Sequence, residues 1–151
     1  MKDVQLSDNF MLSEFTRSET ATRKAIENIP GPHHVANLKL LCEKVLQPLR
    51  DKLGPVIVTS GYRCRPLNTA IGGSGNSQHM QGQAADIRVL GKSVKEVTDW
   101  IKANIKQYDQ LIYEFGEWTH VSYSTEQNRK QNLRATKLGL RTIYSSYDPV
   151  V

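Results

Sequence analysis

Residues 77–90 read Ser-Gln-His-Met-Gln-Gly-Gln-Ala-Ala-Asp-Ile-Arg-Val-Leu, and the fold prediction starts from this stretch. Its first half is polar and contains Gly82, as expected for a loop, whereas residues 84–90 favour a β-strand. His79 lies in the predicted loop, and Asp86 lies seven residues later in the predicted strand. Gly82 and the two alanines that follow it allow the chain to turn between them. A loop ligand and a strand ligand can therefore converge on one point.

A second polar cluster occupies residues 117–122, which read Glu-Trp-Thr-His-Val-Ser and predict another strand. Zinc enzymes commonly use three protein ligands and leave a fourth position for water, and His79, Asp86 and His120 offer suitable donor atoms. A nearby carboxylate can take the proton of a zinc-activated water, and Glu117 is a candidate for that role. Each residue also has an ordinary structural interpretation, as a loop histidine, a cap or a half-buried strand residue. Spacing alone leaves both interpretations open.

The remaining patterns predict helices packed against a small sheet. Apolar residues recur every three or four positions over residues 35–53, which is typical of an amphipathic helix, and Pro48 should kink or divide it. Ser93 and Glu96 form a capping box ahead of a second helix. Strands are predicted at residues 56–60, 84–90, 111–113 and 118–123, the last two as an antiparallel hairpin. The fold class expected is α+β, with a small, mainly antiparallel sheet and flanking helices.

The chain of 151 residues has the size of one domain, and no repeat or linker divides it, so we expect a single domain over residues 1–151. Residues 1–30 predict an extended N-terminal arm and a short helix, and residues 61–81 a glycine-containing loop. Residues 124–137 are polar and basic without periodicity, which predicts a mobile loop.

The charge balance narrows the possible partners only a little. A net charge of +5 and a pI near 9.3 favour anionic surfaces, among them nucleic acid, lipid and bacterial wall polymers. No base-reading helix or zinc finger is present, so we expect no nucleic acid partner. The sequence has no long apolar stretch and no secretory signal, so we expect synthesis in the cytoplasm without a signal peptide and no membrane insertion.

Compared as whole strings, three segments resemble a known family. Ser-Gly-Tyr-Arg at residues 60–63, Ser-x-His-x-x-Gly-x-Ala-x-Asp at 77–86 and Glu-x-x-His at 117–120 are similar, in order, to the signatures of the zinc D-alanyl-D-alanine carboxypeptidases, peptidase family M15. The opening residues 6–18 also resemble the short type of this family, whose members include D-Ala-D-Ala dipeptidases and phage endolysin peptidases. The resemblance implies a hedgehog/D,D-peptidase-like fold, which agrees with the α+β expectation.

The resemblance also implies roles for the matching residues. His79, Asp86 and His120 would be the ligands of one Zn²⁺ per chain, and Glu117 would be the catalytic base. Arg63 would contact the substrate or the transition state, where a guanidinium can hydrogen-bond a developing oxyanion.

Other residues near these motifs have less specific roles. Ser77 and Gln78 are candidate substrate contacts, and Trp118 either lines a substrate groove or belongs to the core. Glu114 lies six residues before His120, and it remains open as the base in place of Glu117.

The function expected is zinc-dependent hydrolysis of peptide bonds in peptidoglycan stem peptides or crosslinks, next to D-alanine. The expected partner is peptidoglycan or its peptides, and the expected oligomeric state is a monomer. The protein would act at the cell wall after release from the cytoplasm, as phage endolysins do. Two alternatives stay open: a cytoplasmic D-Ala-D-Ala dipeptidase, and a non-catalytic phage or wall-binding domain of the same fold.

Overall fold

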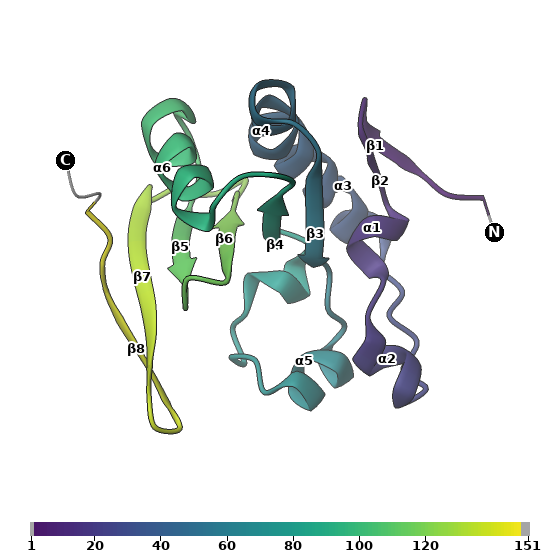
Figure 1. The fold of residues 1–151 in the computed structure, drawn as a ribbon. Helices are drawn as coiled ribbons and strands as arrows, with labels where there is room; N and C mark the ends of the chain where they lie inside the picture. Colours follow the sequence, from purple (N-terminus) through teal and green to yellow (C-terminus); the bar gives the residue numbers. More distant parts are fainter. Residues whose placement is uncertain (1, 149–151) are drawn as a thin grey trace.

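A computed structural model describes residues 2–148, and a mixed six-stranded sheet forms its centre (Figure 1). The strands of this sheet are β3 (Val56–Ser60), β4 (Ala84–Val89), β5 (Gln110–Glu114), β6 (Trp118–Ser122), β7 (Gln131–Leu138) and β8 (Arg141–Ser146). Their spatial order is β3-β4-β6-β5-β7-β8. The β5–β7 pairing is parallel and the other four pairings are antiparallel. The predicted α+β class with a mainly antiparallel sheet is confirmed.

A separate short pair of strands and the helices complete the fold. These elements are β1 (Gln5–Ser7), β2 (Phe10–Met11), α1 (Ser13–Thr16), α2 (Glu19–Arg23), α3 (Pro32–Leu41), η1 (Cys42–Leu46), α4 (Gln47–Leu53), α5 (Arg65–Ile71), η2 (Gln78–Gln81) and α6 (Val94–Asn104). Among residues 2–148, none of the helices combines the length and the hydropathy that crossing a lipid bilayer requires.

The helix predicted over residues 35–53 is one helical segment with an irregular middle. It runs through α3, a π-helical turn at η1 and then α4. The π turn ends just before Pro48, whose ring would collide with the carbonyl four residues earlier in a regular α-helix. The widened turn accommodates the proline within the helix, so that its buried side chains, including Leu41 and Leu46, stay in the core.

The helix predicted after Ser93 is confirmed as α6. The Ser93 hydroxyl accepts a hydrogen bond from the Glu96 N–H, and the Glu96 carboxylate accepts one from the Ser93 N–H, each at 3.1 Å. Val97 and Ile101 of α6 are buried against the sheet. Thr98 Oγ1 also lies 2.9 Å from Thr119 Oγ1 of β6, which joins the helix to the strand that carries His120.

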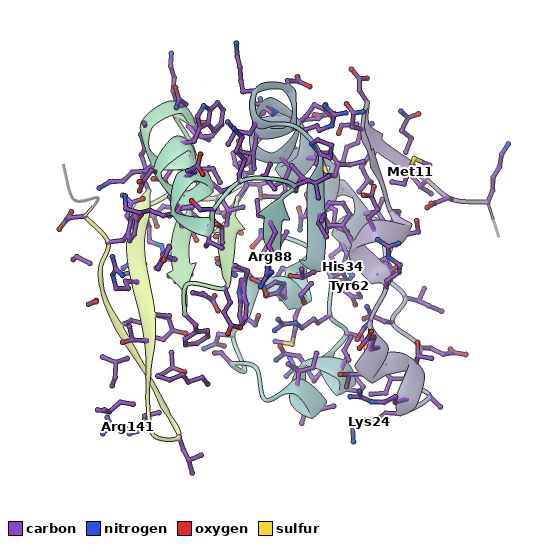
Figure 2. The ribbon with its side chains drawn as sticks, in the orientation of Figure 1. Met11, Lys24, His34, Tyr62, Arg88 and Arg141 are labelled. Carbon is purple, nitrogen blue, oxygen red and sulfur yellow. The ribbon has the colours of Figure 1, made fainter. Side chains whose placement is uncertain are left out.

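The sheet has one covered face and one open face, because successive side chains of a strand point to opposite sides. Val58 and Ile87 lie on the covered face and are buried in the core. Ile57 and Arg88 alternate with them and are exposed on the open face, where Figure 2 labels Arg88. The polar residues of the site lie on this open face.

Three segments differ from the prediction. The segment 61–81 was predicted as a loop but contains α5 and η2. Residues 124–130 are irregular as predicted, but the chain enters β7 at Gln131, so a loop over 124–137 is wrong for its second half. The edge of β5 explains this difference, because it supplies a hydrogen-bonding partner that local sequence does not reveal. The one short helix predicted within residues 1–30 is instead two short helices, α1 and α2.

Candidate metal centre

The structure brings His79, Asp86 and His120 together at one point of the open face. His79 lies in η2, Asp86 on β4 and His120 on the neighbouring β6, where Asp86 and His120 are direct cross-strand partners. All three residues are buried, and one ligand atom from each can be chosen so that the three atoms lie within 4.8 Å of one another. The predicted convergence of a loop residue with two strand residues is therefore observed.

The distances between these donor atoms suit a small metal ion. His79 Nε2 lies 3.4 Å from Asp86 Oδ1, and His120 Nδ1 lies 3.0 Å from the same oxygen. For tetrahedral zinc with bonds of about 2.0–2.2 Å, neighbouring ligand atoms are separated by about 3.3–3.5 Å. Two imidazole nitrogens and one carboxylate oxygen are also the donor types that zinc accepts. The residues present therefore fit a zinc ion without large rearrangement.

The backbone around η2 fixes the orientation of His79. Its Nδ1 lies 2.7 Å from the carbonyl oxygen of Gly61, so Nδ1–H donates there and Nε2 is left to bind a metal. The Ser77 hydroxyl accepts a hydrogen bond from the His79 N–H at 3.2 Å and caps η2. A Cβ on Gly61 would lie 2.6 Å from the Phe15 carbonyl oxygen, so only glycine allows this backbone approach.

Gly82 ends η2 and starts the turn toward Asp86. Its φ of +72° lies in the left-handed region that favours glycine, and a Cβ there would lie 2.5 Å from the His34 carbonyl oxygen. The expectation that Gly82 turns the chain from the histidine to the strand is borne out by this conformation. Figure 2 labels His34, which belongs to α3, and its ring centroid lies 4.8 Å from that of Tyr62.

Arg63, in the segment that follows β3, contacts Asp86 of the metal group formed by His79, Asp86 and His120. Its Nη2 donates to Asp86 Oδ2 at 3.4 Å and its Nε donates to Ser60 Oγ at 3.1 Å. Nη1 donates to Asn68 Oδ1 at 3.4 Å. The guanidinium therefore binds the Asp86 oxygen that faces away from both histidines and lies beside the three donor residues. Its predicted contact with the substrate or the transition state stays a prediction.

The charges of the site shift the pKa values of its members in different directions. Burial lowers the pKa of His79, which favours the neutral imidazole that binds a metal. Burial also disfavours the charged form of His120, but the hydrogen bond and charge of Asp86 outweigh it and raise the pKa of His120. Burial alone would raise the pKa of Asp86, yet the two histidines hold it well below its usual range. Asp86 therefore stays ionised throughout the neutral range, as a carboxylate that holds a metal must be.

Glu114 also faces the metal group. It ends β5 directly opposite Trp118 of β6, and its Oε1 lies 3.7 Å from His120 Nδ1. Burial and the charge of Asp86 raise the pKa of Glu114, against the opposing influence of His120 and Arg63. This carboxylate is the acidic side chain next to the three donors.

Glu117 has a different position, in the turn that joins β5 to β6. Its N–H donates to the Glu114 carbonyl at 2.9 Å, and the two residues between them, Phe115 and Gly116, have φ values of +57° and +68°. Positive φ at both central positions is the pattern of tight hairpin turns. The side chain of Glu117 is exposed, and within residues 2–148 it forms no ion pair with the donors. Its predicted role as base stays a prediction that this position does not favour.

The strand geometry explains this difference. Side chains three residues apart on one strand point to opposite faces, so the Glu-x-x-His spacing does not place Glu117 beside His120. Glu114 reaches the face of His120 because the hairpin register pairs Glu114 with Trp118, two residues before His120. The even spacing of six between Glu114 and His120, together with the predicted hairpin, was the sequence signal for this arrangement.

The comparisons with known proteins agree with this site. A family model described as Peptidase M15 matches residues 8–122, which is about three quarters of the chain and includes the three donors. The chain belongs to the M15 peptidase family. No curated protein matches it. The match ends at Ser122, before β7 and β8 begin.

In this M15 peptidase a cleft of about 630 Å³ opens over the metal group. The predicted residues Arg63, Ser77, Gln78 and Trp118 line it together with the three donors and Glu114. Glu117 is not among its lining residues and borders a neighbouring hollow instead. Further lining residues that the sequence did not indicate as part of the site include Asp109, Ile112, Thr142 and Tyr144.

Two of the predicted contact residues are themselves held in place by other groups. Gln78 Nε2 donates a hydrogen bond to Asp109 Oδ2 at 2.9 Å, and the Arg129 guanidinium donates two hydrogen bonds to the same buried carboxylate. The Trp118 ring packs edge-on against Phe115 with centroids 5.5 Å apart. Its indole Nε1 is buried without a hydrogen-bond partner among residues 2–148. A molecule in the cleft therefore meets the ring of Trp118 and not its buried N–H.

Proposed function

We propose that this chain is a zinc peptidase that hydrolyses peptide bonds in peptidoglycan stem peptides or crosslinks, next to D-alanine. The observation that carries the proposal is the buried group of His79, Asp86 and His120 at the base of a cleft, in a member of the M15 family. Two imidazoles and a carboxylate are a donor set typical of catalytic zinc, with the remaining coordination position available to water.

The chemistry divides between the metal and the side chains around it. When bound, zinc supplies a water of lowered pKa and polarises the scissile carbonyl. Glu114 would serve as the general base that accepts a proton from the attacking water, and then as the acid that returns this proton to the leaving amine nitrogen. Arg63 donates to Asp86 and is near enough to the centre to donate also to the carbonyl oxygen as negative charge develops there.

We assign the base to Glu114 rather than Glu117. The Glu114 carboxylate is 3.7 Å from His120 Nδ1 and lines the cleft, so it would be within reach of a water that the three donor residues and their metal hold there. A carboxyl group whose pKa is raised by burial also accepts a proton more readily than a solvated one. Glu117 is exposed on the turn and lacks both features.

The volume of the cleft favours a longer peptide over a free dipeptide. A cleft of about 630 Å³ has more room than a D-Ala-D-Ala dipeptide fills, which supports a stem peptide or crosslink as substrate. Ser77, Gln78 and Trp118 are the proposed contacts to the peptide, the first two through polar groups and Trp118 through its ring. The net charge of +5 also suits an anionic wall as the place of action.

The deciding experiment is digestion of purified peptidoglycan and of a D-Ala-terminated stem peptide by the zinc-loaded chain, with products identified by mass spectrometry. Loss of D-alanine or of a crosslink supports the proposal and names the bond. Cleavage of free D-Ala-D-Ala alone would establish the dipeptidase alternative instead. Binding to peptidoglycan without any product, at one zinc per chain, would favour a non-catalytic wall-binding domain.

A further inference from the structure

The β7–β8 hairpin adds a wall to the cleft that lies outside the family match. Both strands follow residue 122, where the match ends, and β7 extends the sheet by pairing with the edge of β5. Figure 1 shows the hairpin extending past the β5–β6 turn, with α5 on the other side of that turn. Lys137 of β7 and Tyr144 of β8 both line the cleft. Apart from Arg129, which precedes β7, the cleft-lining residues that follow the family match therefore belong to this hairpin.

Strand register places Tyr144 in one row with the proposed base. Trp118 pairs with Glu114, Glu114 pairs with Ala135 of β7, and Ala135 pairs with Tyr144. Paired residues of adjacent strands point to the same face, so the four side chains follow one line across the open face. Ala135 is small and buried, which leaves space above it for the phenol to approach Glu114. The charges of Glu114 and Asp86 contribute, after burial, to a raised pKa of Tyr144, so its hydroxyl stays protonated as a donor.

Lys137 lies one row further along the same face. It pairs with Thr142, which is two residues from Tyr144, so both side chains point to the cleft. Its Nζ lies 5.0 Å from the centroid of the Phe115 ring, which holds the ammonium near the end of β5. Lys137 forms no ion pair within the described part of the chain.

The two arginines of the cleft are each paired with a buried carboxylate. Arg63 is bound to Asp86, and Arg129 donates through Nε and Nη2 to the two oxygens of Asp109 at 2.7 and 3.0 Å. Their positive charges are balanced by these buried carboxylates. Lys137 is therefore the lining cation whose charge is available to a ligand.

We propose that Lys137 and the Tyr144 hydroxyl form a carboxylate-binding subsite, so that the hairpin selects peptides with a free carboxylate near the cleaved bond. The ammonium supplies the charge, and the phenol donates a hydrogen bond to the carboxylate. The chemistry is shared by a C-terminal carboxylate and an acidic side chain. This inference rests on the proposed peptidase function, because it identifies the substrate class of the same cleft.

The test compares three peptides that share one D-Ala-containing core. One has a free C-terminal carboxylate, the second has a C-terminal amide and one acidic side chain, and the third has no carboxylate. The kcat/KM of the zinc-loaded full chain is measured for each at low ionic strength, where screening is weak. We expect one of the two carboxylate peptides to have a higher kcat/KM than the third peptide. Which of them does so shows whether the subsite binds a C-terminal carboxylate or an acidic side chain.

The variant Lys137→Met should reduce this preference about three-fold, since an exposed charge pair contributes about 0.2–1 kcal/mol. Adding Tyr144→Phe to Lys137→Met should reduce the preference for the carboxylate peptide further. The matched control Lys106→Met changes an exposed lysine outside the cleft lining and should leave this preference unchanged. An unaltered preference in Lys137→Met, or an equal loss in Lys106→Met, would overturn the proposal.

A second readout separates this inference from the peptidase function itself. Calorimetric binding of the same peptides to the zinc-loaded Glu114→Gln chain needs no turnover. If the wild type cleaves none of the peptides but Lys137→Met still weakens binding of the carboxylate form selectively, the peptidase proposal fails and the subsite stands. If cleavage occurs with no carboxylate preference in rate or binding, the subsite fails and the peptidase stands.

Discussion

Two regions of one sheet form this cleft, and they are built in opposite ways. The centre of the sheet, β4, β6 and β5, holds Asp86, His120 and Glu114 on buried strands packed against α6. The β7–β8 hairpin continues the same sheet, but its outer residues Lys137 and Tyr144 are exposed. A metal centre needs ligands fixed in position, whereas an exposed cation can adapt to different substrates. The family match covers the first region and ends before the second.

This contrast predicts which substitutions abolish function and which only adjust it. A buried donor has no replacement, because the strands that hold it cannot shift to bring another group into the same position. A side chain of the hairpin acts across solvent, where charge interactions are weak and screened by salt.

The largest effect is expected for His120→Ala, which removes one of the three donors. Changing only an outer-shell partner of a metal ligand typically costs about 10–100-fold in affinity, so loss of the ligand itself should weaken zinc binding by more than about 100-fold and abolish hydrolysis. Zinc content after dialysis and competition with a chromogenic chelator measure this change. A variant that retains one zinc per chain at wild-type affinity would mean that the metal lies elsewhere.

The next largest effect should separate the two glutamates. Glu114→Gln should lower kcat by about 10²–10⁴-fold, the usual contribution of a general base, while zinc content stays at one per chain. The matched control Glu117→Gln, three residues away in the exposed turn, should keep kcat near the wild-type value. The reverse result would return the base to Glu117 and would require the hairpin turn to rearrange when zinc binds.

Local patterns in the sequence indicated His79, Asp86 and His120 as candidates but left their ordinary structural roles open. The resemblance of three ordered motifs to the M15 family selected them as donors, and the structure brings them together. The choice of base was less secure because spacing along the chain was given more weight than strand parity. The odd separation of Glu117 from His120 on a strand, and the even separation of Glu114, contain the needed information once the hairpin register is known.

The hairpin could not be predicted in the same way. Residues 131–138 carry Leu133 and Ala135 on one face, a short alternation among polar residues that local propensity does not distinguish from a loop. Their strand conformation depends on pairing with β5, which lies about twenty residues earlier in the chain. The second wall of the cleft therefore becomes visible only when the two segments are placed side by side.

An intermediate effect is expected where the backbone supports a ligand. Gly61→Ala would place a methyl group 2.6 Å from the Phe15 carbonyl oxygen and displace the carbonyl that orients His79. We expect a loss of about 1–3 kcal/mol in unfolding free energy, as for other overpacked sites, and weaker zinc binding. Gly75→Ala is the matched control, because its Cβ would meet nothing within 4 Å. Equal stability of both variants in urea denaturation would contradict the close approach.

The smallest effect concerns Asp109, which joins the two regions. Its buried carboxylate accepts hydrogen bonds from Gln78 of the matched region and from Arg129 just before β7. The hydrogen bond and charge of Arg129 lower the pKa of Asp109 despite its burial. Since the folded pKa is below the unfolded value of about 3.9, the carboxylate stabilises the fold above that pH and loses this contribution as the pH falls through the folded pKa.

Asp109→Asn should therefore lower the Tm at pH 7, and its Tm should converge with that of the wild type as the pH falls below about 4. Scanning calorimetry between pH 7 and pH 3 measures both curves under one buffer series. Asp148→Asn is the matched control, because that carboxylate is largely exposed in its ion pair and should leave the Tm nearly unchanged at every pH. A difference between Asp109→Asn and the wild type that stays constant down to pH 3 would mean that packing of the side chain, and not its charge, connects the hairpin to the metal centre.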